Sequence, residues 1–137
     1  MKPLTHLLFS SILAAVFYPI FGWKALLVLA GGVLIDIDHY LWYIYKHKSL
    51  NLISAYKFYI NNVKTNNYSN VYGILLIFHS IEFFIVMTFL SFYIYFTFIF
   101  MIGLLFHYLL DLIFLYRGPK HFIVNHSIIY WIYKKTR

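Results

Sequence analysis

The feature that most constrains this chain is a pair of carboxylates inside an apolar run. The motif Asp36-Ile37-Asp38-His39 lies within Ala25–Tyr45, which is otherwise long and apolar enough to predict a membrane-spanning helix. One Asp at the centre of such a helix costs roughly 2.5 to 3.5 kcal/mol on insertion scales. The chain has only four acidic residues, and the other two, Glu82 and Asp111, also lie in apolar runs. This distribution predicts a helical bundle organised around a polar centre.

The composition is that of an integral membrane protein. The 137 residues are 63% hydrophobic and 11% charged, whereas an average soluble domain is about 25% charged. We therefore expect an all-α fold and a single transmembrane domain over residues 1–137. The chain has no cysteine, which excludes disulfides and thiolate metal sites. The net charge of +7 does not indicate a nucleic-acid partner, because Lys and Arg at helix ends mainly set membrane orientation.

Four apolar runs predict a four-helix bundle in the bilayer. The expected spans cover about 4–21, 25–45, 71–90 and 92–116, each near the length of roughly 20 residues that a span needs. The first run is similar to a signal peptide, but no cleavage site of small residues follows it, so we expect a retained helix. The third and fourth runs are continuous, and we divide them near Ser91.

Two further segments are expected at the membrane surface. Residues 46–70 form the only long polar segment, and their apolar residues recur at helical spacing. This predicts a short interfacial helix, with a plain connecting loop as the alternative. Residues 121–133 are apolar but too short to span, and basic residues follow them. They predict a second interfacial segment at the C-terminus.

The basic residues predict the orientation. With four spans, ten of the eleven Lys and Arg residues lie on the side that holds both termini, and only Lys24 lies on the other. This asymmetry predicts a protein of the plasma (inner) membrane with both termini in the cytoplasm.

Polar residues of the four spans fall at similar depth. At 1.5 Å per residue, Asp36 to His39 lie roughly 9 to 14 Å from the cytoplasmic end of their span. His79 and Glu82 lie roughly 12 to 17 Å from the cytoplasmic end of the third span. His107 and Asp111 lie roughly 8 to 14 Å from the cytoplasmic end of the fourth. His6 lies near the cytoplasmic start of the first span. We therefore expect these groups to converge in the cytoplasmic half of the bundle.

The spacing of these residues predicts a metal site. Pairs three or four residues apart share one helix face, and bundle proteins build metal centres from such His and carboxylate pairs. Mixed ligands of this kind suit zinc above all, with manganese or iron as alternatives, and we expect one to three divalent ions. The candidate ligands are His6, Asp36, His39, His79, His107 and Asp111. A hydrogen-bonded network without metal is the structural alternative.

Asp38 and Glu82 have less certain roles in this pattern. Asp38 is about 200° from Asp36 on an ideal helix, so it requires a distorted helix or a separate function. Two functions are open to Asp38: it would orient a histidine that binds the metal, or it would act as the general base. Glu82 is a candidate for a further ligand or for the base.

Several motifs in order resemble a known family. Thr5-His6, Asp36-Ile37-Asp38-His39, His79-Ser80 and His107-x-x-x-Asp111 resemble the YdjM-like small integral-membrane metal-dependent hydrolases. That family often has an Arg-Gly-x-x-His-Ser element, whereas here no Arg-Gly precedes His79-Ser80, and Glu82 looks like the variant of a related subgroup. The family is also distantly similar to the all-helical zinc phospholipase C and P1 nuclease fold. The resemblance implies a metal-dependent hydrolase.

Together these patterns predict hydrolysis of a phosphoester or lipid-linked substrate by metal-activated water. Asp38 and Glu82 are the candidate catalytic residues. Arg117 and Lys120 would bind an anionic headgroup, or serve only as topology-setting charges. One alternative is a proton or metal-ion transporter, although the outer half of each span lacks ionisable groups. Another is a non-catalytic membrane protein with a structural metal site. The sequence predicts no oligomeric state.

Overall fold

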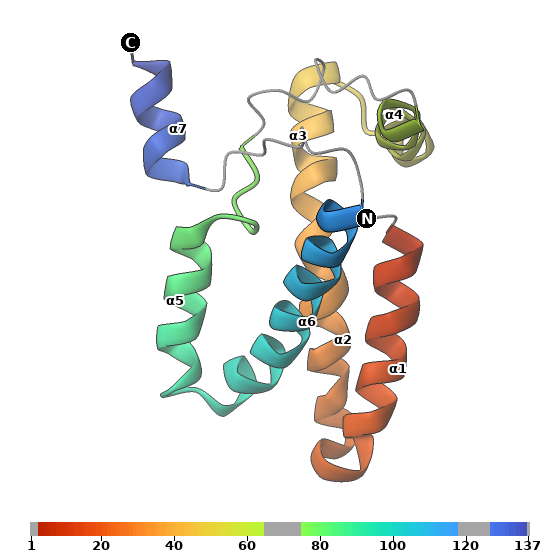
Figure 1. Cartoon of the computed structure of the whole chain (residues 1–137), viewed down its shortest axis with the longest axis vertical. Coiled ribbons are helices and arrows are strands. Elements are labelled where there is room, and N and C mark those ends of the chain that lie inside the picture. Colours follow the sequence, from red (N-terminus) through yellow and green to blue (C-terminus); the bar gives the residue numbers. More distant parts are fainter. Residues whose placement is uncertain (1–2, 65–74, 118–126, 137) are drawn as a thin grey trace. The chain divides into compact units, whose positions relative to one another are not determined.

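The computed structural model describes residues 3–64, 75–117 and 127–136 (Figure 1). These residues form helices joined by turns and contain no β-strand, which confirms the all-α prediction. The α-helices are α1 (Pro3–Phe21), α2 (Leu26–Val33), α3 (Ile37–His47), α4 (Leu52–Lys64), α5 (Ile81–Ser91), α6 (Tyr95–Arg117) and α7 (Ile128–Lys135). Two short 3-10 helices, η1 (Gly22–Ala25) and η2 (Leu34–Asp36), flank α2.

The chain divides into two compact units. The first unit comprises Met1–Ile35 and Phe84–Gly118, and the second comprises Asp36–Phe83 and Pro119–Arg137. Helices α1, α2 and α6 therefore belong to the first unit, while α3, α4 and α7 belong to the second.

Two helical stretches are long and apolar enough to cross a membrane. They are Pro3–His47, which η1 and η2 interrupt, and Tyr95–Ile113. Helix α1 alone has 19 residues and so extends roughly 28 Å, close to the hydrocarbon thickness of a bilayer. Helix α5 is apolar but has only 11 residues.

The helix expected over 71–90 begins only at Ile81. Residues 75–80 are not helical, and residues 71–74 lie outside the described part. Ser80 Oγ accepts a hydrogen bond from Phe83 N at 3.2 Å and so caps the start of α5. His79 consequently lies in a turn instead of on a helix face. The predicted division near Ser91 is confirmed, because α5 ends at Ser91 and α6 begins at Tyr95.

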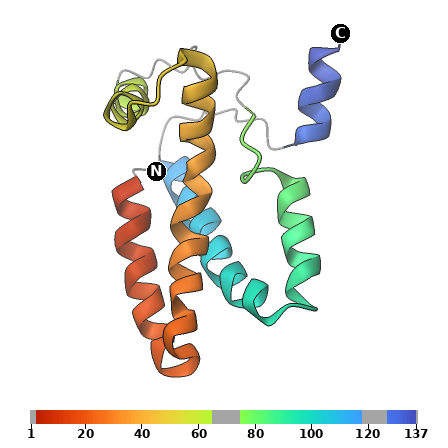
Figure 2. The same ribbon diagram turned by 180° about the vertical axis from the view of Figure 1, so that it is seen from behind.

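Helix α2 packs closely against both α1 and α6 in the first unit (Figures 1 and 2). The apolar core there centres on Ala14, Val28 and Ile99. Glycines allow the close approach, because a methyl group at Gly103 would overlap the Val28 carbonyl oxygen. A methyl group at Gly32 would likewise overlap the Ser10 hydroxyl. Small residues at helix interfaces let the backbones approach this closely.

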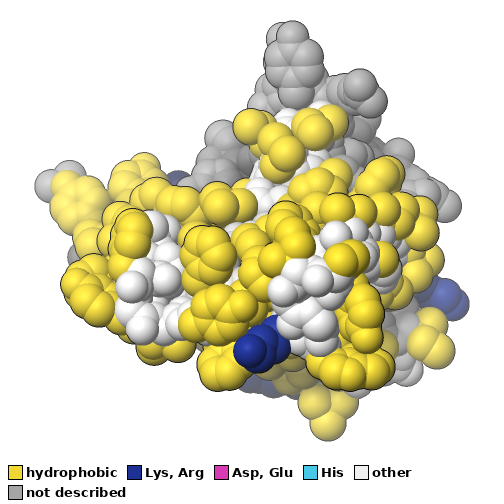
Figure 3. All heavy atoms as spheres, turned by 90° about the horizontal axis from the view of Figure 1, so that it is seen from below, with side chains coloured by type: hydrophobic (Ala, Val, Ile, Leu, Met, Phe, Trp, Pro, Cys, Tyr) yellow, Lys and Arg dark blue, Asp and Glu magenta, His cyan; other side chains and the backbone are white. Residues whose placement is uncertain are grey.

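Beside its apolar core, the first unit buries polar side chains and exposes many apolar ones. His6, Ser10 and His107 are each 0% exposed. Large apolar side chains of the same helices, such as Val16 and Leu112, are exposed. Figure 3 shows a face made mostly of hydrophobic side chains. Exposed apolar area on this scale is typical of a surface that contacts lipid or another apolar partner.

In the second unit, α3 packs against α4. Tyr40 Oη donates to the Leu50 carbonyl at 2.6 Å, and Phe58 packs against the stacked rings of Tyr43 and His47. Helix α3 ends where Lys48 adopts a left-handed conformation, with φ of 53°. Helix α4 confirms a short helix within the polar segment 46–70, whose residues 65–70 lie outside the described part.

Candidate functional site

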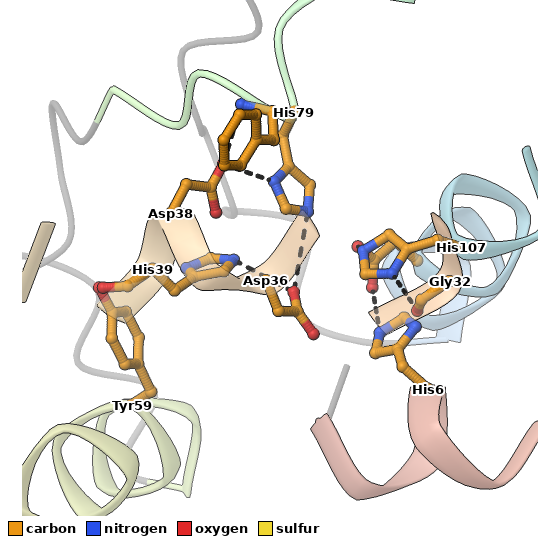
Figure 4. Close-up of polar contacts among 10 residues, drawn as sticks. His6, Gly32, Asp36, Asp38, His39, Tyr59, His79 and His107 are labelled. Atoms are coloured by element: carbon orange, nitrogen blue, oxygen red, sulfur yellow. Dashed lines mark hydrogen bonds and ion pairs between the residues drawn. The ribbon is translucent and has the colours of Figure 1, made fainter. Parts of the chain in front are cut away.

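The candidate ligands form two clusters, one in each unit (Figure 4). The first cluster consists of His6 on α1 with His107 and Asp111 on α6. The second cluster consists of Asp36, Asp38 and His39 at the start of α3 with His79 from the turn before α5. In each cluster, three residues offer ligand atoms within 4.8 Å of one another: His6, His107 and Asp111 in the first, and Asp38, His39 and His79 in the second.

In the first cluster, one carboxylate joins two stacked imidazoles. Asp111 Oδ1 lies 3.1 Å from His6 Nε2, and Asp111 Oδ2 lies 3.3 Å from His107 Nε2. The two imidazole rings are stacked with centroids 4.0 Å apart. Because His107 and Asp111 are four residues apart on α6, the helix itself directs both toward α1.

The backbone fixes which nitrogen of His107 carries the proton. His107 Nδ1 lies 3.0 Å from the Gly32 carbonyl oxygen, which can only accept a hydrogen bond, so Nδ1 must donate. In a neutral imidazole, Nε2 is then a bare acceptor, and it faces the acceptor Oδ2 of Asp111. Two acceptors 3.3 Å apart repel each other unless a proton or a cation lies between them.

This arrangement fits a divalent cation. His6, His107 and Asp111 each offer a ligand atom, and these atoms lie within 4.8 Å of one another, so the three residues could hold a metal ion. His6 Nδ1 is buried and has no hydrogen-bond partner among the described residues, which is costly for a polar atom.

In the second cluster, Asp38 orients His79. Asp38 Oδ2 lies 3.0 Å from His79 Nδ1 and accepts a second hydrogen bond from Phe78 N at 3.1 Å. A carboxylate can only accept here, so His79 carries its proton on Nδ1 and keeps Nε2 available as a ligand. A carboxylate behind a histidine is the usual support of a metal-binding imidazole. This contact matches the supporting role that the sequence left open for Asp38.

Asp36 lies between the two histidines of the second cluster. Its Oδ1 is 3.8 Å from both His39 Nε2 and His79 Nε2, and Figure 4 shows both nitrogens directed toward it. Asp36 occupies the N-cap position of α3, yet its side chain makes no capping hydrogen bond. The 3-10 segment Leu34–Asp36 supplies the distorted helix that the sequence required for Asp36 and Asp38 to act in one place.

A tyrosine on α4, Tyr59, supports this cluster. Tyr59 Oη on α4 donates to the His39 carbonyl at 2.8 Å, and its ring lies edge-on to the His39 imidazole. Burial raises the pKa of the Tyr59 hydroxyl above its usual range, and the nearby Asp38 carboxylate raises it further. The hydroxyl therefore stays protonated and remains a donor to His39.

The histidines of the two clusters differ in accessibility. The side chains of His6 and His107 are 1% and 0% exposed, while Asp111 in the same cluster is 25% exposed. In the second cluster, Asp36 is 19% and His39 25% exposed. Asp38 Oδ1 is buried and has no hydrogen-bond partner among the described residues. The second cluster thus combines an accessible side with an uncompensated carboxylate oxygen.

Of the remaining predicted residues, the structure describes the side chain of Glu82 alone. The Glu82 carboxylate accepts hydrogen bonds from Ser127, Ile128 and Ile129 at the start of α7, and it belongs to neither cluster. Arg117 ends α6, but its side chain lies outside the described part, as does all of Lys120. Their expected role in headgroup binding stays a prediction.

Ser10 is a buried polar residue near the first cluster that the sequence did not single out. This residue lies one turn after His6 on α1, is fully buried, and its hydroxyl has no hydrogen-bond partner among the described residues. The four-residue spacing from His6 was the available signal, since it places both on one face. Tyr59 gave no such signal, because its contact with His39 spans 20 residues.

Comparison with known proteins gives no match to a protein-family model, a curated protein or a solved structure. The resemblance to YdjM-like hydrolases therefore stays a prediction from the motifs.

Proposed function

We propose that this protein is a membrane-embedded metal-dependent hydrolase that acts on a phosphoester or lipid-linked substrate. The observation that carries the proposal is the Asp38–His79 pair, in which a buried carboxylate fixes one ring nitrogen and leaves the other directed at Asp36. Such pairs are typical of histidines that bind a metal ion. The order of the His and Asp motifs, which resembles YdjM-like hydrolases, supports the same function.

The second cluster is the proposed reaction site. His39, His79 and Asp36 would hold the ion, Asp38 would orient His79, and Tyr59 would fix the backbone of His39. A divalent cation there supplies Lewis acidity and lowers the pKa of a water ligand to roughly 7. The partly exposed Asp36 and His39 leave a side from which a substrate can approach.

The first cluster has a proposed structural role. The two histidines His6 and His107 are fully buried, and only Asp111, at 25%, is partly exposed. Structural metal sites are closed, whereas catalytic ones keep an open position. An ion there would join α1 to α6 through His6 and Asp111. This burial is also the observation that favours a second candidate function, a non-catalytic membrane protein stabilised by a metal.

The exposed apolar surface supports the proposed membrane location. Polar groups are buried and apolar groups exposed in the first unit, which is the distribution expected in lipid. We propose that the chain spans the inner membrane with both termini in the cytoplasm, as the basic residues predict. A lipid-linked substrate would then reach the site from the bilayer.

The proposal is tested by assaying purified protein after reconstitution with zinc, manganese or iron. Substrates would be a phospholipid, a lipid phosphate and a generic phosphodiester, and the variants would be His79→Ala and the control His47→Ala. His47 lies on the same helix as His39 but stacks on Tyr43, outside both clusters. We expect His79→Ala to abolish hydrolysis and His47→Ala to retain it. Metal-loaded wild-type protein that hydrolyses none of these substrates would contradict the proposal.

A further inference from the structure

Helix α7 is amphipathic and exposes its apolar face. Ile129, Ile132 and Tyr133 fall within an arc of roughly 100° at 100° per residue, and all three are exposed, Ile129 at 71%. Lys134 and Lys135 lie outside this arc, in the last turn. An eight-residue helix with this division of residues is typical of a segment that lies at a membrane surface.

The charges of α7 favour an anionic surface. The helix has two lysines and no acidic residue, and Lys135 Nζ lies 4.7 Å from the centroid of the Trp131 ring. Tryptophan is enriched at the level of the lipid headgroups. Basic residues near an anionic leaflet are attracted to it, so the polar face complements acidic headgroups while the apolar face complements acyl chains.

Glu82 holds the beginning of this helix. Its carboxylate accepts hydrogen bonds from Ser127 Oγ at 2.7 Å, Ile128 N at 3.0 Å and Ile129 N at 3.2 Å. The first N–H groups of a helix lack partners within the helix and carry partial positive charge. The Glu82 carboxylate therefore accepts hydrogen bonds from two of these N–H groups, those of Ile128 and Ile129. It thereby fixes the N-terminal turn of α7 to the start of α5.

We propose that α7 binds anionic lipid headgroups at the bilayer surface, with Glu82 anchoring its first turn so that Ile129 faces the acyl chains. This inference rests on the membrane location proposed above, but not on hydrolase activity. It assigns to Glu82 a positioning function in place of the catalytic one that the sequence suggested.

The absence of cysteine from the chain allows a site-specific depth measurement. A spin label would be attached at Ile129→Cys on the apolar face or at Lys134→Cys on the polar face, with the full chain in nanodiscs. Collisions with oxygen, which concentrates in the bilayer, would be compared with collisions with a water-soluble nickel chelate. Nanodiscs would contain phosphatidylcholine alone or with phosphatidylglycerol.

We expect the oxygen-to-nickel ratio to be several-fold higher at position 129 than at 134 in discs that contain phosphatidylglycerol. The ratio at 129 should fall in phosphatidylcholine alone and with Lys135→Glu, but not with Lys57→Glu, the same charge change on the exposed side of α4. Glu82→Ala should lower the ratio at 129 and increase label mobility.

Two results would overturn the inference. Protein that fails to enter nanodiscs contradicts the membrane location and, with it, the binding of α7. Protein that enters nanodiscs but shows equal ratios at 129 and 134, whatever the lipid, contradicts the binding of α7 alone.

Discussion

Asp38 Oδ2 lies 3.0 Å from His79 Nδ1, across 41 residues of sequence. The same oxygen accepts the backbone N–H of Phe78, so one carboxylate fixes both the turn before α5 and the ring within it. His79 is thereby held with Nε2 directed at Asp36. The ligand set of the second cluster thus depends on a residue that is not itself required to bind the ion.

Replacing Asp38 should weaken metal binding at the second cluster alone. Asp38→Asn removes the charge behind His79 and should lower the metal affinity of the second cluster by about 10–100-fold. Competition with a chromophoric chelator would measure the metal affinity of the variant and of the wild type. The matched control is Asp111→Asn, which should affect the first cluster and leave the second one unchanged. Equal affinity in Asp38→Asn and wild type would show that His79 needs no support.

Two tyrosine variants distinguish a role in positioning His39 from a general contribution to folding stability. Tyr59→Phe removes the 2.8 Å hydrogen bond to the His39 carbonyl, and Tyr40→Phe removes the 2.6 Å bond to the Leu50 carbonyl. Each change should cost about 0.5–1.5 kcal/mol of folding free energy. Only Tyr59→Phe should also reduce metal affinity at the second cluster. Thermal unfolding and chelator competition on both variants would check this, and a metal affinity lowered equally in both would argue against a positioning role.

A methyl group at Gly103 should disrupt the packing of α2 on α6. The added carbon of Gly103→Ala would overlap the Val28 carbonyl oxygen, and such overpacking costs about 1–3 kcal/mol. Because His107 lies one turn later on α6, the first cluster should also lose metal at a lower temperature. The comparison is Leu105→Ala, an exposed residue of the same helix, which should unfold close to the wild-type temperature.

The attachment of α7 should not vary with pH between 5 and 8. The Glu82 carboxylate accepts hydrogen bonds from Ser127 Oγ, Ile128 N and Ile129 N. Hydrogen bonds to the charged form of a carboxylate favour that form, so these contacts should persist over this pH range.

Hydrogen exchange of the Ile128 and Ile129 amides, corrected for the intrinsic pH dependence, would measure this. Their protection should be constant from pH 8 to 5 in the wild type and reduced at every pH in Glu82→Ala. Protection that declined between pH 7 and 5 would indicate that another group, not Glu82, holds α7.

The sequence predicted those parts of the structure that depend on periodicity and on local signals. The helix α4 and the division near Ser91 both followed from the residues themselves. The pairing of His107 with Asp111 followed from their spacing of four.

Other features depend on tertiary contacts that no local pattern encodes. The apolar run from 71 predicted a helix through His79, but Ser80 caps α5 and leaves His79 in a turn. Ser80 with Glu82 in the first turn was the available helix-start signal. The contacts of Tyr59 with His39 and of Glu82 with α7 join distant segments, so spacing could not reveal them.

The central claim is that the two clusters hold divalent metal ions, and metal analysis tests it most directly. Detergent-purified protein would be measured by elemental analysis beside His107→Ala, His79→Ala and His47→Ala, with folding checked by circular dichroism. We predict one equivalent of zinc, manganese or iron for each cluster, with one lost in His107→Ala, the other lost in His79→Ala, and both retained in His47→Ala. Folded wild-type protein that binds no metal even after reconstitution would contradict the claim, and the buried carboxylates would then form a hydrogen-bonded network.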